Sequence, residues 1–181
     1  MLLSAQDSCL LIVDVQEKLV PAIHEPEQLV GGCAWLMQVA NVLAVPILVS
    51  EQYPIGLGPT VAELRGLVSP EAFVEKVHFS CAAAPDCLRR LDAIARRQVV
   101  LAGIEAHVCV LQTALGLAQA GKQVFVVADA ISSRNPQDAT VGIARMRAVG
   151  VHVVTKEMAL FEWAERAATT QFRLLSNNFL R

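Results

Sequence analysis

Cys109 is the residue of this chain best placed for covalent chemistry. It follows a short apolar run at 98–102 and ends the segment Gly-Ile-Glu-Ala-His-Val-Cys, which predicts a turn from a strand into a helix. In the first turn of a helix, the helix dipole and the free backbone N–H groups favour a thiolate. We therefore predict a lowered pKa for Cys109, as a cysteine nucleophile requires. The alternative interpretation is a small buried hydrophobe, which is the role of most free cysteines.

Asp14 and Lys76 are the ionisable residues that can assist such a thiol. Asp14 ends the apolar run at 9–13, and Lys76 closes the run at 72–76. Because ligands of a parallel sheet bind beyond the carboxyl ends of its strands, we expect both side chains to converge on Cys109. An acid, a cation and a thiol then supply a proton shuttle, a charge partner and a nucleophile. Taken singly, Asp14 is equally a turn cap, and Lys76 a solvated surface lysine. Three further polar residues follow predicted strands and are expected at the same edge: Glu51, Gln52 and Asp129.

The elements that must position these residues alternate along the chain. Short, nearly all-apolar runs predict strands at 9–13, 46–50, 98–102, 123–128 and 151–154. Apolar residues at three- and four-residue spacing predict helices at 26–43, 85–95, 108–120, 136–149 and 171–180. The region 52–80, rich in Pro and Gly at its start, predicts an irregular loop with one short helix at 61–67. This order predicts a single α/β domain over residues 1–181, with a doubly wound, mostly parallel, Rossmann-like sheet flanked by helices.

Composition narrows the class of partner. The chain of 181 residues carries 15 basic and 17 acidic residues without runs, for a formal net charge of -2. This balance offers no footprint for nucleic acid or for a membrane surface, so we expect a small-molecule substrate. With 54% hydrophobic and only 18% charged residues, we also expect a homo-oligomer, a dimer or larger.

The cysteines and the N-terminal segment indicate a reducing compartment. The five cysteines are an odd number at irregular spacing, which predicts neither a disulfide framework nor a zinc site. The first residues lack the basic segment of a signal peptide, so we expect a cytoplasmic protein. The uncharged stretch 28–50 is interrupted by Gln38, Asn41 and Pro46, which favours a buried helix and strand over a membrane span.

Three segments resemble the isochorismatase-like cysteine hydrolases, a superfamily that also contains nicotinamidases and carbamoyl-amide hydrolases. Leu-Leu-Ile-Val-Asp-Val-Gln-Glu-Lys-Leu (10–19) resembles the family's first strand, and Val-Glu-Lys-Val-His-Phe-Ser (74–80) its lysine segment. Gly-Ile-Glu-Ala-His-Val-Cys-Val-Leu-Gln-Thr-Ala (103–114) resembles its nucleophile turn. Glu-Gln-Tyr-Pro-Ile-Gly-Leu-Gly-Pro-Thr (51–60) is similar to a subgroup known only as isochorismatase domain-containing proteins. The resemblance implies an isochorismatase-like hydrolase fold.

The resemblance also implies roles for particular residues. Asp14 takes the proton from Cys109, the thiolate attacks an acyl carbon to form a thioester, and Asp14 then protonates the departing amine. Lys76 holds the other two in their charged forms. The backbone N–H groups of Glu105 and Cys109 face the developing oxyanion, and the peptide between Ile104 and Glu105 is expected to be cis.

Departures from the family pattern narrow the chemistry. Nicotinamidases bind a metal through an aspartate and histidines after the second strand, but the segment 52–58 contains neither, so we expect no metal and no cofactor. True isochorismatases tend to replace the cysteine, so Cys109 favours a metal-independent hydrolase of a small amide or related acyl compound. Two alternatives stay open: a vinyl-ether hydrolase of the isochorismatase type, and a non-catalytic oligomeric protein that binds small molecules.

Other polar and aromatic residues receive secondary roles. The candidate pocket residues are Gln16, Gln52, Tyr53, His78 and Phe79. His107 is expected to be structural, because side chains two residues apart on a helix point about 200° apart. The loop 132–134 is expected to make hydrogen bonds to other loops rather than to take part in chemistry.

Overall fold

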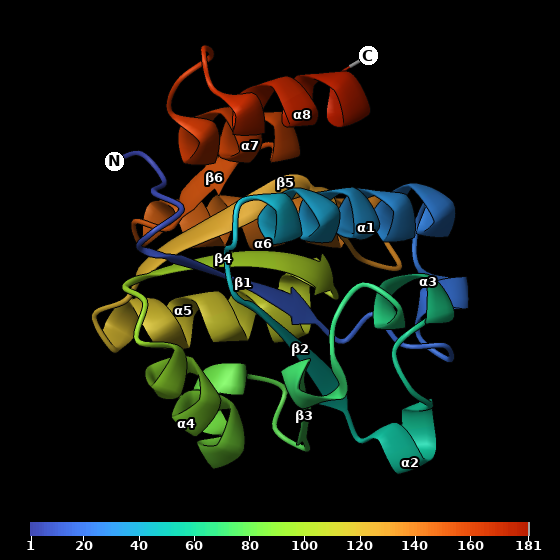
Figure 1. The fold of residues 1–181 in the computed structure, drawn as a ribbon. Helices are drawn as coiled ribbons and strands as arrows, with labels where there is room; N and C mark the ends of the chain where they lie inside the picture. Colours follow the sequence, from blue (N-terminus) through green and yellow to red (C-terminus); the bar gives the residue numbers. More distant parts are fainter. Residues whose placement is uncertain (181) are drawn as a thin grey trace.

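Six parallel strands form the centre of the computed structural model, which describes residues 1–180. The strands are β1 (Ser8–Val13), β2 (Ile47–Gln52), β3 (Phe73–Lys76), β4 (Gln98–Ile104), β5 (Gln123–Ser132) and β6 (His152–Val154). Their order in the sheet is β3-β2-β1-β4-β5-β6, so the winding reverses between β1 and β4 (Figure 1). The predicted doubly wound α/β fold is confirmed, and its switch point lies where Asp14 leaves β1.

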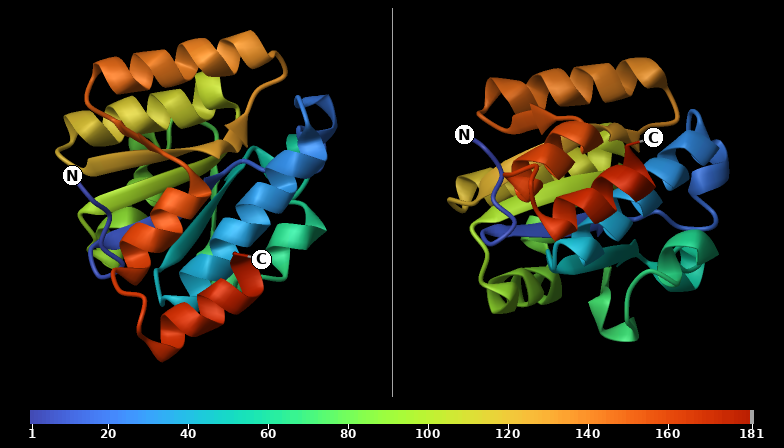
Figure 2. Two further views of the ribbon diagram at one scale, coloured as in Figure 1. Left: turned by 90° about the horizontal axis from the view of Figure 1, so that it is seen from above. Right: turned by 45° about the horizontal axis from the view of Figure 1, so that its top comes forward.

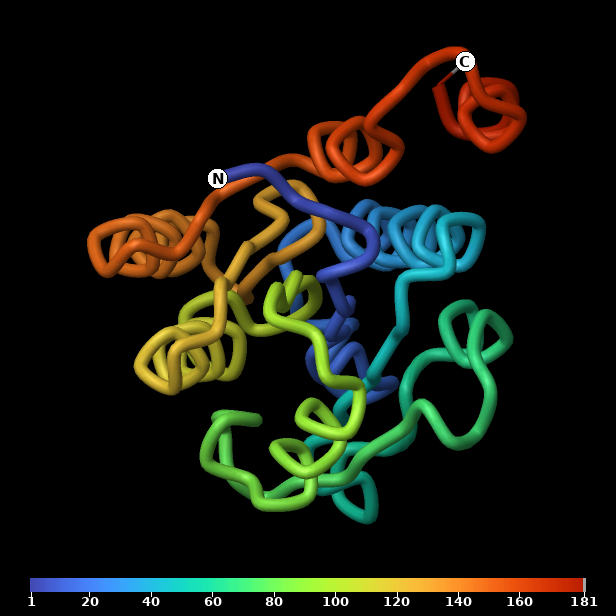
Figure 3. The backbone as a smooth tube through the Cα atoms, turned by 60° about the vertical axis from the view of Figure 1, so that its left-hand side comes forward, coloured from blue at the N-terminus to red at the C-terminus, as the bar shows by residue number. Residues whose placement is uncertain are grey.

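Helices cover both faces of this sheet. The longer helices are α1 (Pro26–Val42), α4 (Pro85–Ile94), α5 (Leu111–Gln119), α6 (Pro136–Ala148), α7 (Lys156–Ala164) and α8 (Thr170–Phe179). Short turns of helix fill the connections: η1 (Val20–Ala22), α2 (Pro54–Leu57), α3 (Ala62–Arg65), η2 (Pro70–Ala72), η3 (Cys81–Ala83) and η4 (Ala106–Val110). Helices α1, α7 and α8 lie side by side on one face (Figure 2). Helices α4, α5 and α6 cover the other face, and Figure 3 shows α5 and α6 as neighbouring coils.

The strand sequences explain this two-sided packing. All six residues of β1 are buried, and successive side chains alternate between the two faces. Leu10 and Ile12 pack in the cluster with α1, whereas Leu11 and Val13 pack in the cluster with α4 and α5. The central strands therefore need apolar residues at every position, which is why they read as continuous runs.

Helix ends follow the expected signals. The Asn135 side chain accepts a hydrogen bond from the Gln137 N–H at 3.0 Å, and Pro136 occupies the first turn of α6. Gly121 and Gly150 follow α5 and α6 with φ of 82° and 89°, a conformation that favours glycine. No helix in residues 1–180 has the length and apolar content needed to cross a bilayer.

Three parts of the chain differ from the sequence-based expectation. Strand β3 lies inside the region 52–80, which was expected to be mostly irregular, although the run at 72–76 was expected to end at the sheet edge with Lys76; four residues on a sheet edge are too few for a clear periodic signal. Helix α7 was not predicted, although Thr155 caps it by accepting from the Met158 N–H at 3.2 Å. Strand β5 continues past Asp129 to Ser132 through a register shift against β4.

Gly103 allows β1 and β4 to approach closely beside the switch point. It has φ of 115°, and a Cβ atom placed there would lie 2.2 Å from the Val13 carbonyl oxygen. No side chain fits in this space, so glycine is required where the chain leaves β4 toward Cys109.

Candidate active site

The structure brings Asp14, Lys76 and Cys109 together at the carboxyl ends of β1, β3 and β4; we call these three residues the site cluster. The Lys76 Nζ donates to Asp14 Oδ2 at 2.7 Å, and both side chains are almost completely buried. Cys109 is 8% exposed, and its thiol is close enough to the Asp14 carboxylate for each group to shift the pKa of the other. The carboxylate therefore lies between an ammonium group and a thiol.

The Lys76 ammonium is surrounded by oxygen acceptors. Besides Asp14, it donates to Gln52 Oε1 at 2.6 Å and to the carbonyl oxygens of His78 at 3.2 Å and Phe79 at 3.1 Å. Burial lowers the pKa of Lys76, but Asp14 and the nearby thiols outweigh burial, so the pKa lies above its usual value. Lys76 therefore stays charged, and its protons are directed to protein acceptors.

Asp14 is held by groups on two other strands. Its Oδ1 accepts from the Ser50 hydroxyl at 2.7 Å, and its own N–H donates to the Ser50 carbonyl at 3.1 Å. Burial raises the pKa of Asp14 above its usual value, although Lys76, Ser50 and Cys109 all act to lower it. Asp14 has φ of 52°, a left-handed conformation that aspartate tolerates better than most residues.

Cys109 does not have the lowered pKa that its position predicts. Burial raises the pKa of the thiol, the Asp14 carboxylate raises it further, and Lys76 only partly compensates. The turn that carries Cys109 is a π-helical turn, η4, which leads into α5, rather than the first turn of a regular α-helix. The resting Cys109 thiol is consequently neutral.

The turn between β4 and Cys109 is attached to the loop after β5. The expected cis peptide between Ile104 and Glu105 is present. Glu105 Oε2 accepts from the Arg134 backbone N–H at 3.1 Å and from Arg134 Nε at 3.0 Å. His107 Nδ1 and Ser133 Oγ lie 2.9 Å apart. His107 and the loop 132–134 thus make the loop-to-loop hydrogen bonds expected of them, and they lie outside the site cluster.

Gln16 and Gln52, both expected to line the pocket, instead organise the protein around it. Gln16 has no exposed surface: its Nε2 donates to the carbonyls of Gln52 at 2.9 Å and Gly58 at 2.7 Å, and its Oε1 accepts from the Gln52 N–H at 2.7 Å. Gln52 binds Lys76 through Oε1 and donates from Nε2 to the Val77 carbonyl at 2.8 Å. Their polar atoms therefore hold the loops and Lys76 rather than pointing to a ligand.

The aromatic candidates lie at the surface beside the site cluster. Tyr53 and Phe79 are half exposed, and His78 is exposed. A cavity of about 420 Å³ is lined by Tyr53, Lys76 and His78 among others. A second cavity, of about 330 Å³, adjoins Glu105 and Arg134 on the other side. Both cavities lie at the carboxyl edge of the sheet.

Two other strand-end residues turn away from the site cluster. Glu51 Oε1 accepts from Thr60 and from Arg65 Nη1, the latter at 3.1 Å. Asp129 lies within the extended β5 and accepts from the Lys156 backbone N–H at 2.8 Å. The expectation that all strand-end polar residues converge is therefore wrong for these two.

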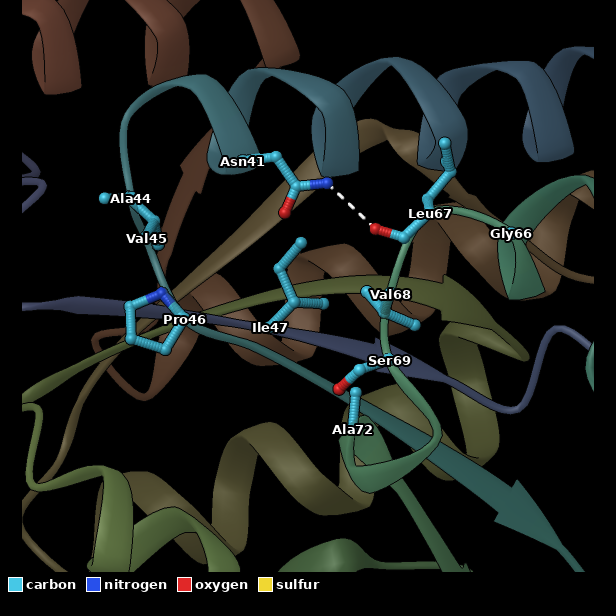
Figure 4. Close-up of a pocket in the computed structure, with 10 residues that line it drawn as sticks. All are labelled: Asn41, Ala44, Val45, Pro46, Ile47, Gly66, Leu67, Val68, Ser69 and Ala72. Atoms are coloured by element: carbon cyan, nitrogen blue, oxygen red, sulfur yellow. Dashed lines mark hydrogen bonds between the residues drawn. The ribbon is translucent and has the colours of Figure 1, made fainter.

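A larger hollow, of about 500 Å³, lies at the opposite end of β2 (Figure 4). The end of α1, the start of β2 and the segment 66–72 line it, and Asn41 Nδ2 donates across it to the Leu67 carbonyl at 2.9 Å. Its lining contains no ionisable side chain. Size alone therefore does not mark the functional site of this protein.

Ser50 and Cys81 are neighbours of the site cluster that the sequence interpretation missed. Cys81 in η3 is completely buried and is close enough to Ser50 for that hydroxyl to act on the pKa of its thiol. Ser50 directly precedes the strand-end pair Glu51 and Gln52, and this position in the sequence could have identified it as a neighbour of the site. Within residues 1–180, no group of three or more His, Cys, Asp or Glu side chains is arranged to hold a metal ion.

The arrangement defines a class: α/β proteins with a buried thiol, carboxylate and ammonium at the switch point of a doubly wound sheet. Residues 8–158 match the family model described as the Isochorismatase domain. The chain therefore belongs to the isochorismatase domain family.

Relatives and solved structures agree with this membership. The chain is 42% identical over 170 residues to isochorismatase domain-containing protein 2A of Mus musculus, with 93% of this chain and 80% of that protein covered. The structure of MAR1 ribonuclease from Caenorhabditis elegans matches with a TM-score of 0.93 and 31% identity, over 100% of this chain and 93% of that one. The YcaC gene product of Escherichia coli, an octameric hydrolase of unknown specificity, matches with a TM-score of 0.92 and 24% identity, over 99% and 92%. This last likeness shows the fold alone.

Proposed function

We propose that this protein is a metal-independent cysteine hydrolase that cleaves a small amide or related acyl compound. The observation that carries the proposal is the buried Asp14 carboxylate, which lies 2.7 Å from the Lys76 ammonium and close enough to the Cys109 thiol to raise its pKa. A carboxylate in this position accepts the thiol proton, and the fixed ammonium favours its ionised form against the effect of burial.

The proposed reaction has two stages. As Cys109 Sγ attacks the acyl carbon, its proton moves to Asp14, and the backbone N–H groups of Glu105 and Cys109 stabilise the oxyanion. Asp14 then protonates the leaving amine, and a thioester remains on Cys109. Water attacks the thioester with Asp14 as the base, the acid product is released, and Asp14 returns the proton to the Cys109 thiolate.

The raised pKa of Cys109 suits this scheme. A free thiolate needs no neighbouring base, whereas a neutral thiol beside a carboxylate delivers its proton within the pair. The fraction of thiolate is then independent of pH between the titration of Asp14 and that of Cys109. A flat pH profile for Cys109 reactivity in this range is the signature of the pair.

The name of the C. elegans neighbour raises RNA as a substrate, and charge argues against it here. The chain has a net charge of -2, with its basic residues scattered, whereas binding to a phosphate backbone relies on clustered positive charge. RNA therefore belongs in the assay panel as a substrate that we expect not to be cleaved.

The test is a panel of small amides, carbamoyl acids, isochorismate and RNA, with Cys109→Ala as the variant. Cys33→Ala is the matched control, because Cys33 is also a buried thiol but lies on α1. We expect amide cleavage by the wild type and by Cys33→Ala, loss of at least about 10³-fold in Cys109→Ala, and an acyl adduct on Cys109 in the intact mass. Amide cleavage that survives in Cys109→Ala would contradict the proposal.

The same panel separates the alternatives. A vinyl ether is hydrolysed through protonation by an acid such as Asp14, without a thioester. Isochorismate cleavage that is unaffected by Cys109→Ala therefore identifies an isochorismatase-type enzyme. Saturable binding of a panel member, with no turnover of any, identifies a binding protein.

We also propose that the protein forms a homo-oligomer. Four large apolar or aromatic side chains beside the site cluster are exposed: Tyr53, Ile55, Val77 and Phe79. Ile55 is 88% exposed, an arrangement more typical of a contact surface than of a monomer. Light scattering should give a mass of two or more chains, and Ile55→Asp should lower it; a monomeric wild type would contradict this.

A further inference from the structure

Ser50 contacts Asp14 but has no task in the reaction proposed above. It lies in β2 and has no exposed surface, and its hydroxyl donates to Asp14 Oδ1 at 2.7 Å. Lys76 donates to the other oxygen, Oδ2, also at 2.7 Å. Rotation of a carboxylate about its terminal bond is otherwise broad. Donors on both oxygens therefore fix the plane of the Asp14 carboxylate.

Ser50 is itself supported from the side of Cys109. The pKa of the buried Cys81 thiol is lowered by a hydrogen bond with Cys87 and, to a lesser degree, by the nearby Ser50 hydroxyl, so Cys81 and Ser50 are neighbours. The Cys81 backbone N–H donates to Thr113 Oγ1 at 2.9 Å, and this contact is buried. Thr113 belongs to α5, the helix that continues from the turn carrying Cys109. The contacts thus run from the helix of the thiol, through Cys81 and Ser50, to the carboxylate.

We propose that Ser50 is a positioning residue that orients the Asp14 carboxylate to accept the Cys109 proton. Cys81 and Thr113 keep Ser50 in a fixed position relative to α5, the helix that follows Cys109. The inference rests on the proposed role of Asp14 as the base. No bond forms or breaks at Ser50, whose hydroxyl keeps its proton throughout.

A pH readout separates this role from a merely structural one. The Ser50 hydrogen bond stabilises the ionised carboxylate and acts to lower the pKa of Asp14 against the effect of burial. Its removal should therefore raise the pKa at which Asp14 becomes a base. The other ionisable groups that act on Asp14 are Lys76 from β3, Cys81 from η3, Cys87 from α4 and Cys109 from η4. Ser50→Ala leaves all of them in place.

The experiment compares Ser50→Ala with Ser8→Ala, in the full-length chain. Ser8 is an equally buried serine on the neighbouring strand, and it binds Gln98 and Trp163 at the opposite end of the sheet. The readout is the rate of Cys109 alkylation by iodoacetamide across pH, measured by peptide mass spectrometry, which needs no known substrate. In Ser50→Ala we expect the acid edge of the flat region to move up by about one pH unit, because Asp14 loses the hydrogen bond that acts to lower its pKa. In Ser8→Ala the acid edge should stay within about 0.3 pH unit of the wild type.

Ser50→Cys provides a second variant in case Ser50→Ala does not fold. Its thiol is a weak donor of similar size, so the same shift is expected at smaller amplitude. An acid edge like that of the wild type, in either folded variant, would overturn the role of Ser50 and leave the proposed function intact. A wild type whose Cys109 shows no flat region at all contradicts the proposed function itself, so the two failures are distinguishable.

Discussion

The two ends of β1 each bury a polar residue, and they do so in different ways. At the start of the strand, the Ser8 hydroxyl donates to Gln98 Oε1 at 3.0 Å and accepts from Trp163 Nε1 at 3.0 Å. Beyond the last residue of the strand, Asp14 binds Lys76 and Ser50, each at 2.7 Å. Among residues 1–180, no buried side-chain nitrogen or oxygen lacks a hydrogen-bond partner, so both ends are equally well satisfied.

The difference is charge, and it indicates which end performs chemistry. At the amino end of the sheet, neutral hydrogen bonds join β1 to its neighbours, so no ion has to be removed from water. A buried ion pair incurs that cost and is often no more stable than apolar residues in its place. If the carboxyl end of the sheet required only stabilisation, a neutral hydrogen-bond network like that of Ser8 would be sufficient there. We therefore attribute the ion pair to function, and the predictions test that contrast.

The largest effect is expected on breaking the ion pair. Lys76→Met leaves the Asp14 carboxylate buried without its cation, which should cost about 3–5 kcal/mol in the free energy of unfolding by urea. The double variant Asp14→Asn, Lys76→Met removes both charges and should recover most of this loss while staying inactive. A single variant as stable as the wild type would show that the pair is not buried as described.

The next effect is the pH dependence of turnover. Because burial raises the pKa of Asp14 above its usual 3.8, activity should decline about tenfold per pH unit on the acid side, with a midpoint above 3.8. Because the pKa of Cys109 is also raised, no change is expected at the ordinary thiol value of 9.0. Rates of the active substrate across pH check both limbs. A midpoint near 9.0 would indicate an ordinary, unpaired thiol.

A smaller effect is expected at the amino end, on stability alone. Ser8→Ala leaves the Trp163 N–H and the Gln98 oxygen without a buried partner, which should cost about 1–3 kcal/mol in the free energy of unfolding. The turnover number should stay within about twofold, because no contact joins Ser8 to the site cluster. A large loss of activity in folded Ser8→Ala would contradict the claim that only the carboxyl end of the sheet takes part in the chemistry.

The smallest effect concerns thiols that have no carboxylate beside them. Burial raises the pKa of Cys9 to about 11 and of Cys33 to about 12, from 9.0 in the unfolded chain. Their contribution to stability is complete below 9.0 and is lost as pH rises through the folded values, by about 1 kcal/mol per thiol between about pH 8 and about pH 10. Urea unfolding at both pH values should show this decline. In Cys33→Ala the decline in the free energy of unfolding should be smaller by the contribution of one thiol. The same decline in Cys33→Ala and in the wild type would contradict this prediction.

The sequence predicted the central strands better than the edges. Strands β1 and β4 are all-apolar runs with clear ends, and that pattern arises because both faces of the strands are buried. Strand β3 was recognised only as the short run that ends in Lys76, because it has four residues on an edge. Asp129 was misplaced because β5 continues through a register shift. Such features depend on neighbouring strands rather than on local sequence.

The site shows the same division between local and tertiary information. Asp14, Lys76 and Cys109 were identifiable from residue type, spacing and family resemblance. The direction of the pKa shift of Cys109 was not, because burial and the contact with Asp14 are properties of the folded chain. Ser50 resembles any small residue in a buried strand, and its hydrogen bond to Asp14 becomes apparent only once β1 and β2 are paired.

The central claim, that Asp14 accepts the proton of Cys109, is tested most directly by Cys109 alkylation across pH in the wild type and in Asp14→Asn. In the wild type the rate should be flat between the titration of Asp14 and that of Cys109, because the thiolate forms within the pair. In Asp14→Asn the proton must leave to solvent, so the rate should rise roughly tenfold per pH unit until the thiol titrates. A wild-type rate that rises tenfold per unit, in parallel with that of Asp14→Asn, would contradict the account.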